Sequence, residues 1–164
     1  ASSAAARLVK AGGGAVILDP APVPPGGLDA EALRDVDILT PNETEAEILT
    51  GIRPDGRDSI RAAAERLRAM AGAAVVKLGG NGCYVADTTD IGMVAPFKVT
   101  PVDTVAAGDS FNAGLAVAIA QRIGMRAAVR FAGACGALAT TRPGAAAAAP
   151  TLSEVETLLR RSRS

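Results

Sequence analysis

The order of apolar and polar segments predicts an α/β fold, with a mainly parallel sheet and helices on both of its faces. Short apolar stretches alternate with longer segments of helical periodicity, which is typical of strands joined by crossover helices. Apolar residues make up 49% of the chain and aromatic residues only 2%, so small aliphatic side chains must fill the core. Residues 1–164 are enough for one domain and too few for two domains of typical size.

The predicted strands are short apolar stretches bounded by turn-forming residues. They cover residues 15–18, 36–39 and 73–78, with smaller antiparallel strands at 83–86 and 92–95. The predicted helices cover residues 4–10, 29–34, 46–50, 58–71, 112–121, 126–141 and 151–161. The helix at 58–71 has the clearest amphipathic pattern, with Ile60, Ala64, Leu67 and Met70 on one side.

The residue inventory excludes several kinds of chemistry. The chain contains no histidine, so Ser–His and Cys–His nucleophilic catalysis and histidine-bound metals are ruled out. The 17 basic and 17 acidic residues cancel, which gives no support for a nucleic-acid or membrane partner. Cys83 and Cys135 form no CxxC motif and indicate reduced core thiols of a cytoplasmic protein, with a single disulfide between them as the alternative. Neither a membrane span nor a signal peptide is expected.

Three polar or glycine-bearing turns follow predicted strands or apolar segments, at residues 41–45, 79–82 and 103–109. In sheets of this kind, ligands bind outside the carboxyl ends of the strands. A shared location at that edge makes a binding site more probable than any single turn does.

The turn at residues 103–109 runs into the helical segment at 112–121. Its small residues let backbone N–H groups approach a ligand, and unpaired amides at a helix start favour a phosphate. Asp109 lies within this turn. A carboxylate beside an anion site suits phosphoryl transfer, in which it accepts the proton of the attacking hydroxyl. The alternative is an ordinary aspartate in the first turn of a helix, which the helix dipole favours.

The other turns allow two interpretations each. Asn42 and Glu45 have capping-box spacing, but Glu45 could also help to hold hydrated Mg²⁺. The segment at 79–82 is first of all a hairpin turn, although a nucleotide could lie along its glycines. Lys77 could meet a phosphate or simply end a strand in solvent. Arg142-Pro-Gly144 ends a helix, and carbonyls there and at residues 103–105 could bind a cation.

Taken together, these motifs resemble the ribokinase, or PfkB-type carbohydrate kinase, family, and bacterial ribokinases in particular. The resemblance is carried by five segments: Asp19-Pro-Ala-Pro22, Thr40 to Glu47 with Leu49-Thr-Gly51, Lys77-Leu-Gly-Gly-Asn-Gly82, Asp103-Thr-Val-Ala-Ala-Gly-Asp-Ser-Phe-Asn112, and Arg130 to Gly144. It implies a three-layer α/β/α ribokinase-like fold. It also implies ATP-dependent phosphorylation of a primary hydroxyl of a pentose, D-ribose above all.

The resemblance implies roles for residues of this chain. Asp109 would be the catalytic base, and the amides of Ala106, Ala107 and Gly108 the anion hole. The nucleotide would contact Asn42, Lys77, Leu78, Gly79, Gly80, Asn81, Gly82, Gly108, Asp109 and Gly133. Glu45 would help to hold Mg²⁺ near the phosphates. A monovalent cation such as K⁺ would lie near Asp103, Val105, Ala139, Arg142 and Gly144.

Two departures from the family pattern matter. Gly133 stands where close ribokinases often carry Asn. The chain also resembles only the family's carboxyl-terminal half, so the amino-terminal half and lid, with the Gly-Gly-x-x-x-Asn sugar motif, are expected to be missing. Homodimerisation, which usually runs through that lid, depends on the missing half. Two alternatives therefore stay open: a nucleotide-binding remnant without kinase activity, and a family kinase acting on fructose, a keto-deoxy sugar acid or a nucleoside.

Overall fold

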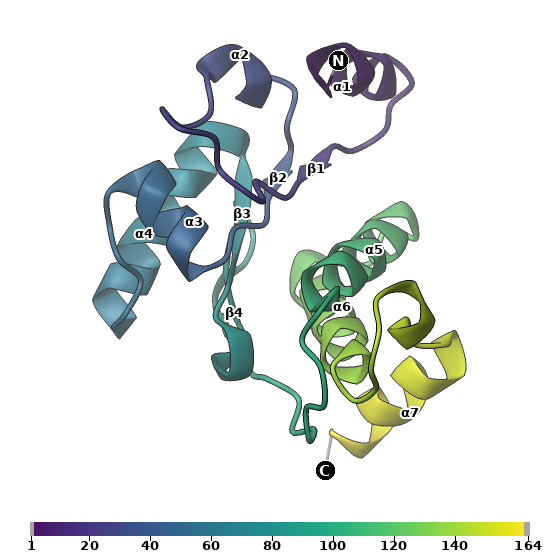
Figure 1. The fold of residues 1–164 in the computed structure, drawn as a ribbon. Helices are drawn as coiled ribbons and strands as arrows, with labels where there is room; N and C mark the ends of the chain where they lie inside the picture. The colour runs from purple at the N-terminus through teal and green to yellow at the C-terminus, as the bar shows by residue number, and fades with distance from the viewer. Residues whose placement is uncertain (1, 163–164) are drawn as a thin grey trace. The chain divides into compact units, whose positions relative to one another are not determined.

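The structure is a computed structural model that describes residues 2–162, and these form two compact units. The first unit contains residues 2–79 and 83–93, and the second contains residues 80–82 and 94–162. The first holds nearly all of the sheet, whereas the second is mainly helical (Figure 1). Within residues 2–162, no helix is both long and apolar enough to cross a membrane.

The sheet has five strands, which lie side by side in chain order. They are β1 (Ile17–Leu18), β2 (Ile38–Leu39), β3 (Ala73–Lys77), β4 (Cys83–Ala86) and β5 (Ile91–Val94). β1, β2 and β3 pair in parallel, and β4 runs antiparallel to β3. The predicted order of parallel strands followed by antiparallel ones is confirmed.

The first two strands begin later than their apolar stretches predict. Val16 donates its N–H to the carboxylate of Asp37 at 2.8 Å, so a side chain takes the place of a ladder partner there. The same carboxylate pairs with Lys10 at 2.6 Å. The Asp37 side chain thus replaces only the partner of the Val16 N–H, because the Val16 carbonyl still accepts the N–H groups of Asp37 and Ile38.

The helices of the first unit are α1 (Ser2–Ala11), α2 (Ala30–Leu33), α3 (Glu43–Thr50) and α4 (Arg57–Ala71). The long helix α4 packs along β2, β3 and β4 (Figure 1). Its apolar side buries Ala64 and Leu67 completely, against Leu39 and Val76 of the sheet. This contact confirms the apolar face that the periodicity of residues 58–71 predicts.

The second unit is built from α5 (Ala107–Ala120), α6 (Met125–Ala139) and α7 (Leu152–Arg161), with a short 3-10 turn η2 at Ala146–Ala148. Small residues bring α5 and α6 close together. A Cβ added at Gly114 would lie 2.7 Å from Sγ of Cys135, and one at Gly136 would lie 3.1 Å from the carbonyl oxygen of Ala107. The contact at Gly136 fixes the first turn of α5 against α6.

The start of α5 differs from the prediction. The helix begins at Ala107 and not at Asn112, so Gly108 and Asp109 lie in its first turn. Glycine and polar residues weaken the local helix signal there, and packing against α6 through Gly136 overrides it. The helix α6 ends at Ala139, two residues before its predicted end at residue 141.

Candidate active site

In the first unit, the residues that follow the parallel strands meet at the carboxyl edge of the sheet. Asp19 follows β1, Asn42 follows β2, and Lys77 ends β3. The N–H of Lys77 donates to the carbonyl of Pro41 at 2.8 Å, and Asn42 forms a parallel bridge with Lys77. The expectation that turns after neighbouring strands share one edge is confirmed for this unit.

Asn42 and Glu45 form the predicted capping box at the start of α3. The side-chain oxygen of Asn42 accepts the N–H of Glu45 at 2.9 Å, and Oε2 of Glu45 accepts the N–H of Asn42 at 2.8 Å. Among the described residues, Oε1 of Glu45 has no protein partner. The carboxylate is therefore held in place by one oxygen and offers the other to a ligand, although the residue is buried.

Lys77 does not end its strand in solvent. Its ammonium group pairs with the carboxylate of Asp19 at 2.7 Å, and the two side chains are 15% and 25% exposed. A largely buried ammonium group needs such a counter-charge. Sequence reasoning placed Lys77 at this edge but gave no sign of its partner, which lies 58 residues away.

The glycine turn after β3 is a hairpin connection, as the first of its two interpretations predicted. Gly79–Asn81 form a 3-10 turn, η1, between the antiparallel strands β3 and β4. Gly79 and Gly82 have φ angles of 52° and 89°, which favour glycine. The side chain of Leu78 is buried in the sheet core, whereas Gly79, Gly80 and Asn81 are exposed.

In the second unit, the turn before α5 presents backbone N–H groups at a helix start. Ala106 caps the helix in a left-handed conformation, with φ of 59°. The N–H of Ala107 makes a 3.3 Å bond to the carbonyl of Thr104. Within the described chain, the N–H groups of Ala106 and Gly108 have no protein acceptor. Unpaired amides at the positive end of a helix dipole form a site suited to an anion.

Asp109 lies in the first turn of α5, next to these amides. Its side chain is exposed, and among residues 2–162 no donor contacts its carboxylate. The neighbouring Ser110 is buried and its N–H continues the helix by donating to Ala106 at 2.9 Å. The carboxylate is thus free to accept a proton from a ligand.

Most of the residues predicted to hold a monovalent cation lie together. The carboxylate of Asp103 accepts the N–H of Val105 at 2.9 Å and that of Gly144 at 3.1 Å. These two bonds hold the pKa of Asp103 below its ordinary value. The carbonyl of Thr140, next to Ala139, accepts the N–H groups of Val102 and Asp103. The ligands that these residues could offer, a carboxylate and backbone carbonyls, are oxygen atoms, which suit an alkali cation better than a transition metal.

Among the described residues, no group of three or more His, Cys, Asp or Glu side chains is arranged to bind a metal ion. Both cysteines are free and buried. Burial raises the pKa of Cys83 to about 12 and that of Cys135 to about 11. Neither thiol is therefore an activated nucleophile.

Gly133 lies on α6 beside an aromatic side chain. The ring of Phe97 lies 3.6 Å from the position of a Cβ added at Gly133, and the guanidinium group of Arg130 stacks on the same ring at 5.0 Å. A larger residue at position 133 would meet this ring, so glycine leaves the Phe97 edge uncovered.

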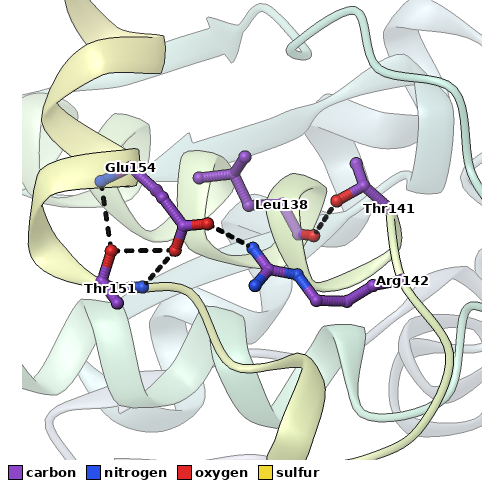
Figure 2. A network of polar contacts seen from close by, with 5 residues as sticks. All are labelled: Leu138, Thr141, Arg142, Thr151 and Glu154. Carbon is purple, nitrogen blue, oxygen red and sulfur yellow. Dashed lines mark hydrogen bonds and ion pairs between the residues drawn. The ribbon is translucent and has the colours of Figure 1, made fainter.

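One polar network in the second unit, formed by Arg142, Thr151 and Glu154, was not predicted. Figure 2 shows the guanidinium group of Arg142 directed at Glu154, with Nη2 and Oε1 2.7 Å apart. The other oxygen of Glu154 accepts the N–H and the hydroxyl of Thr151, which caps α7. Thr151-Leu-Ser-Glu154 carries the capping-box signature in the sequence, so the signal was available.

Comparison with known proteins identifies the family. The model of the "pfkB family carbohydrate kinase" matches residues 2–152. The chain belongs to this family. A PfkB-family relative, the ribokinase of Haemophilus influenzae, is 37% identical over 151 residues, which cover 92% of this chain and 49% of the relative.

Solved structures of PfkB-family proteins agree with this assignment. The ribokinase of Thermotoga maritima matches with a TM-score of 0.80 at 36% identity, over 95% of this chain and 52% of that one. The Arabidopsis thaliana ribokinase complexed with ribose and ATP matches with a TM-score of 0.83 at 32% identity, over 97% and 52%. The expected ribokinase-like α/β fold is confirmed, and the chain spans about half the length of the relatives it matches.

Proposed function

We propose that this chain carries the nucleotide-binding, carboxyl-terminal half of an ATP-dependent sugar kinase, which converts D-ribose to ribose 5-phosphate. The observation that carries the proposal is the exposed carboxylate of Asp109, without a protein partner among residues 2–162, beside the unpaired amides of Ala106 and Gly108. Membership of the PfkB family and the likeness to a ribokinase complexed with ribose and ATP support it.

The proposed reaction is an in-line displacement at the γ-phosphorus of ATP. The sugar hydroxyl oxygen forms a bond to phosphorus, the bond to the bridging oxygen of ADP breaks, and the hydroxyl proton passes to Asp109. The amides of Ala106, Ala107 and Gly108 would stabilise the negative charge on the transferring group. For Ala107 this requires release of its long bond to Thr104.

Residues of the first unit would serve the nucleotide and its metal. Glu45, whose Oε2 is bonded to the Asn42 N–H, would hold hydrated Mg²⁺ through Oε1. The ion neutralises phosphate charge when bound. Asn42, Lys77 and Gly79 would contact the nucleotide, as would residues 80–82 and Gly133 of the second unit. Asp103, Val105, Ala139, Arg142 and Gly144 would hold K⁺ through carboxylate and carbonyl oxygens.

The experiment places Asp109→Asn and Asp58→Asn in the complete enzyme, which carries both halves, and compares each variant with the wild-type enzyme. Asp58 is a matched control, because it is an exposed aspartate in the first turn of another helix, α4. We expect Asp109→Asn to bind MgATP normally and to lose roughly 10²–10⁴-fold in turnover of D-ribose, the usual contribution of one general base. Wild-type turnover in Asp109→Asn would rule out the assigned role.

A second candidate function is nucleotide binding without phosphoryl transfer, which is favoured by the chain's match to only half of its relatives. A wild-type chain that binds MgATP but phosphorylates no sugar would support it. Turnover of fructose, a keto-deoxy sugar acid or a nucleoside in place of D-ribose would instead change the substrate within the same mechanism.

A further inference from the structure

The loop at residues 140–144 holds the turn that precedes α5. The carbonyl of Thr140 accepts the N–H groups of Val102 and Asp103, at 2.7 and 3.1 Å. The N–H of Gly144 donates to the Asp103 carboxylate at 3.1 Å. The position of Asp103, and of the chain that leads from it to Asp109, therefore depends on the conformation of this loop.

The first part of the loop is fixed by α6 itself. The hydroxyl of Thr140 donates to the carbonyl of Ala137 at 2.7 Å. The hydroxyl of Thr141 donates to the carbonyl of Leu138, also at 2.7 Å (Figure 2). The remaining part, from Arg142 to Gly144, lies beyond α6. Among the described residues, the side-chain contact that holds this part is the ion pair of Arg142 with Glu154.

The carboxylate of Glu154, with which Arg142 pairs, is itself held in place by the cap of α7. Oε1 of Glu154 accepts from Arg142 at 2.7 Å, while Oε2 accepts the N–H of Thr151 at 2.7 Å and its hydroxyl at 2.8 Å. Both side chains of the ion pair are little more than one-third exposed. Such a pair adds little to overall stability. Its main effect is therefore on the conformation of the loop at residues 140–144.

We propose that Glu154 is a positioning residue for the phosphate-binding turn: through Arg142 it holds the 140–144 loop in the conformation that fixes Asp103 and the amides at the start of α5. This inference rests on the proposed function, because it assigns Glu154 to the same anion site. Glu154 touches no reacting atom and acts only through Arg142 and the loop.

The test uses four variants of the chain, together with the double variant of the first two. Glu154→Gln removes the charge that faces Arg142 but leaves an acceptor for Thr151, and Arg142→Met breaks the pair without touching the cap. Arg142→Lys keeps the positive charge. Arg160→Met is the matched control, because it breaks an exposed ion pair with Glu156 on the same helix. Amide hydrogen exchange at Val105 and Gly144 and MgADP affinity are measured for each.

We expect Glu154→Gln and Arg142→Met each to speed exchange at Val105 and Gly144, and to weaken MgADP binding by roughly threefold to thirtyfold, as coupled positions commonly do. The double variant should be no worse than either single one, because both remove the same contact. Arg142→Lys should restore most of the affinity, and Arg160→Met should change neither measurement.

Two results would overturn the positioning role. One is wild-type exchange at both amides in Arg142→Met, and the other is faster exchange with unchanged MgADP affinity, which would make the pair structural only. A wild-type chain that binds no MgADP at all would instead contradict the proposed function, and with it this inference. Failure of the positioning role alone leaves wild-type binding intact and insensitive to Arg142→Met.

Discussion

At the residue scale, the conformation of Ala106 sets the direction of the amides at the start of α5. Ala106 has a φ angle of 59°, a left-handed conformation that it shares, among non-glycine residues of the described chain, with Arg122 alone. A residue with a Cβ pays roughly 1–2 kcal/mol for this conformation. Strain of this kind persists where the surrounding structure fixes it, often at functional sites. Here the packing of the first turn of α5 against Gly136 supplies that constraint.

Ala106→Gly should therefore stabilise the second unit. The relief of strain, less the roughly 0.5–1 kcal/mol that glycine loses in conformational entropy, leaves an expected gain of about 0.5–1 kcal/mol in the free energy of unfolding. Urea denaturation would measure it. Ala116→Gly is the control, since it lies in the regular part of α5 and should destabilise the chain by about 0.5–1 kcal/mol. Equal destabilisation by both variants would show that Ala106 is not left-handed in solution.

Single residues differ in how far the sequence reveals their contacts. The capping box of Asn42 and Glu45 was predicted because its two bonds depend on a spacing of three residues. The pairing of Lys77 with Asp19 was not, because a contact across 58 residues depends on strand order, which local patterns do not encode. The left-handed Ala106 left no signal either, because alanine gives no preference for that conformation.

At the element scale, the capping network of α7 links the stability of this helix to pH. Glu154 accepts the N–H and hydroxyl of Thr151 and pairs with Arg142, and these contacts lower its pKa from 4.5 to about 2. The start of α7 was predicted to within one residue, whereas the start of α5, which has no side-chain cap, was not. The start of α5 was placed five residues late, because the glycine and polar residues of its first turn resemble a loop until α6 packs against them.

The stability that Glu154 contributes should be lost in acid. Because its pKa is lower in the folded chain than in the unfolded one, the ionised carboxylate stabilises the folded state fully above about pH 4.5, and this contribution disappears as the pH falls towards 2. Asp103, whose pKa is also lowered, acts in the same direction. Urea denaturation of the wild type and Glu154→Gln should show a stability difference at pH 6 that shrinks steadily below pH 4.5.

Glu156→Gln provides the comparison for that titration. Glu156 lies on the same helix but makes only an exposed pair with Arg160, 3.7 Å away, so its replacement should alter stability little at any pH. A Glu154→Gln difference that is independent of pH would show that the carboxylate contributes through its shape and not through its charge.

At the scale of the whole molecule, the residues assigned to nucleotide, metal and base are divided between two compact units. Asn42, Glu45 and Lys77 belong to the first, and Asp103 and Asp109 to the second. The alternation of strands and helices was sufficient to predict the fold class, because each strand and helix carries its own periodicity. The division into units was not predicted, because it depends on contacts between distant segments.

The ligand response of the whole chain follows from these assignments. MgATP or MgADP at 100 times its dissociation constant should stabilise the folded chain by about 2.7 kcal/mol, and so raise its melting temperature. K⁺ should add to the effect of nucleotide more than the same concentration of choline does, since the proposed cation ligands are carboxylate and carbonyl oxygens. D-ribose alone should have no effect, because the family's sugar motif has no counterpart in these 164 residues. A thermal-shift panel with each ligand, singly and in pairs, measures all three responses. Stabilisation by D-ribose without nucleotide would place a sugar site within this chain, and the absence of any nucleotide response would refute the proposed nucleotide-binding function.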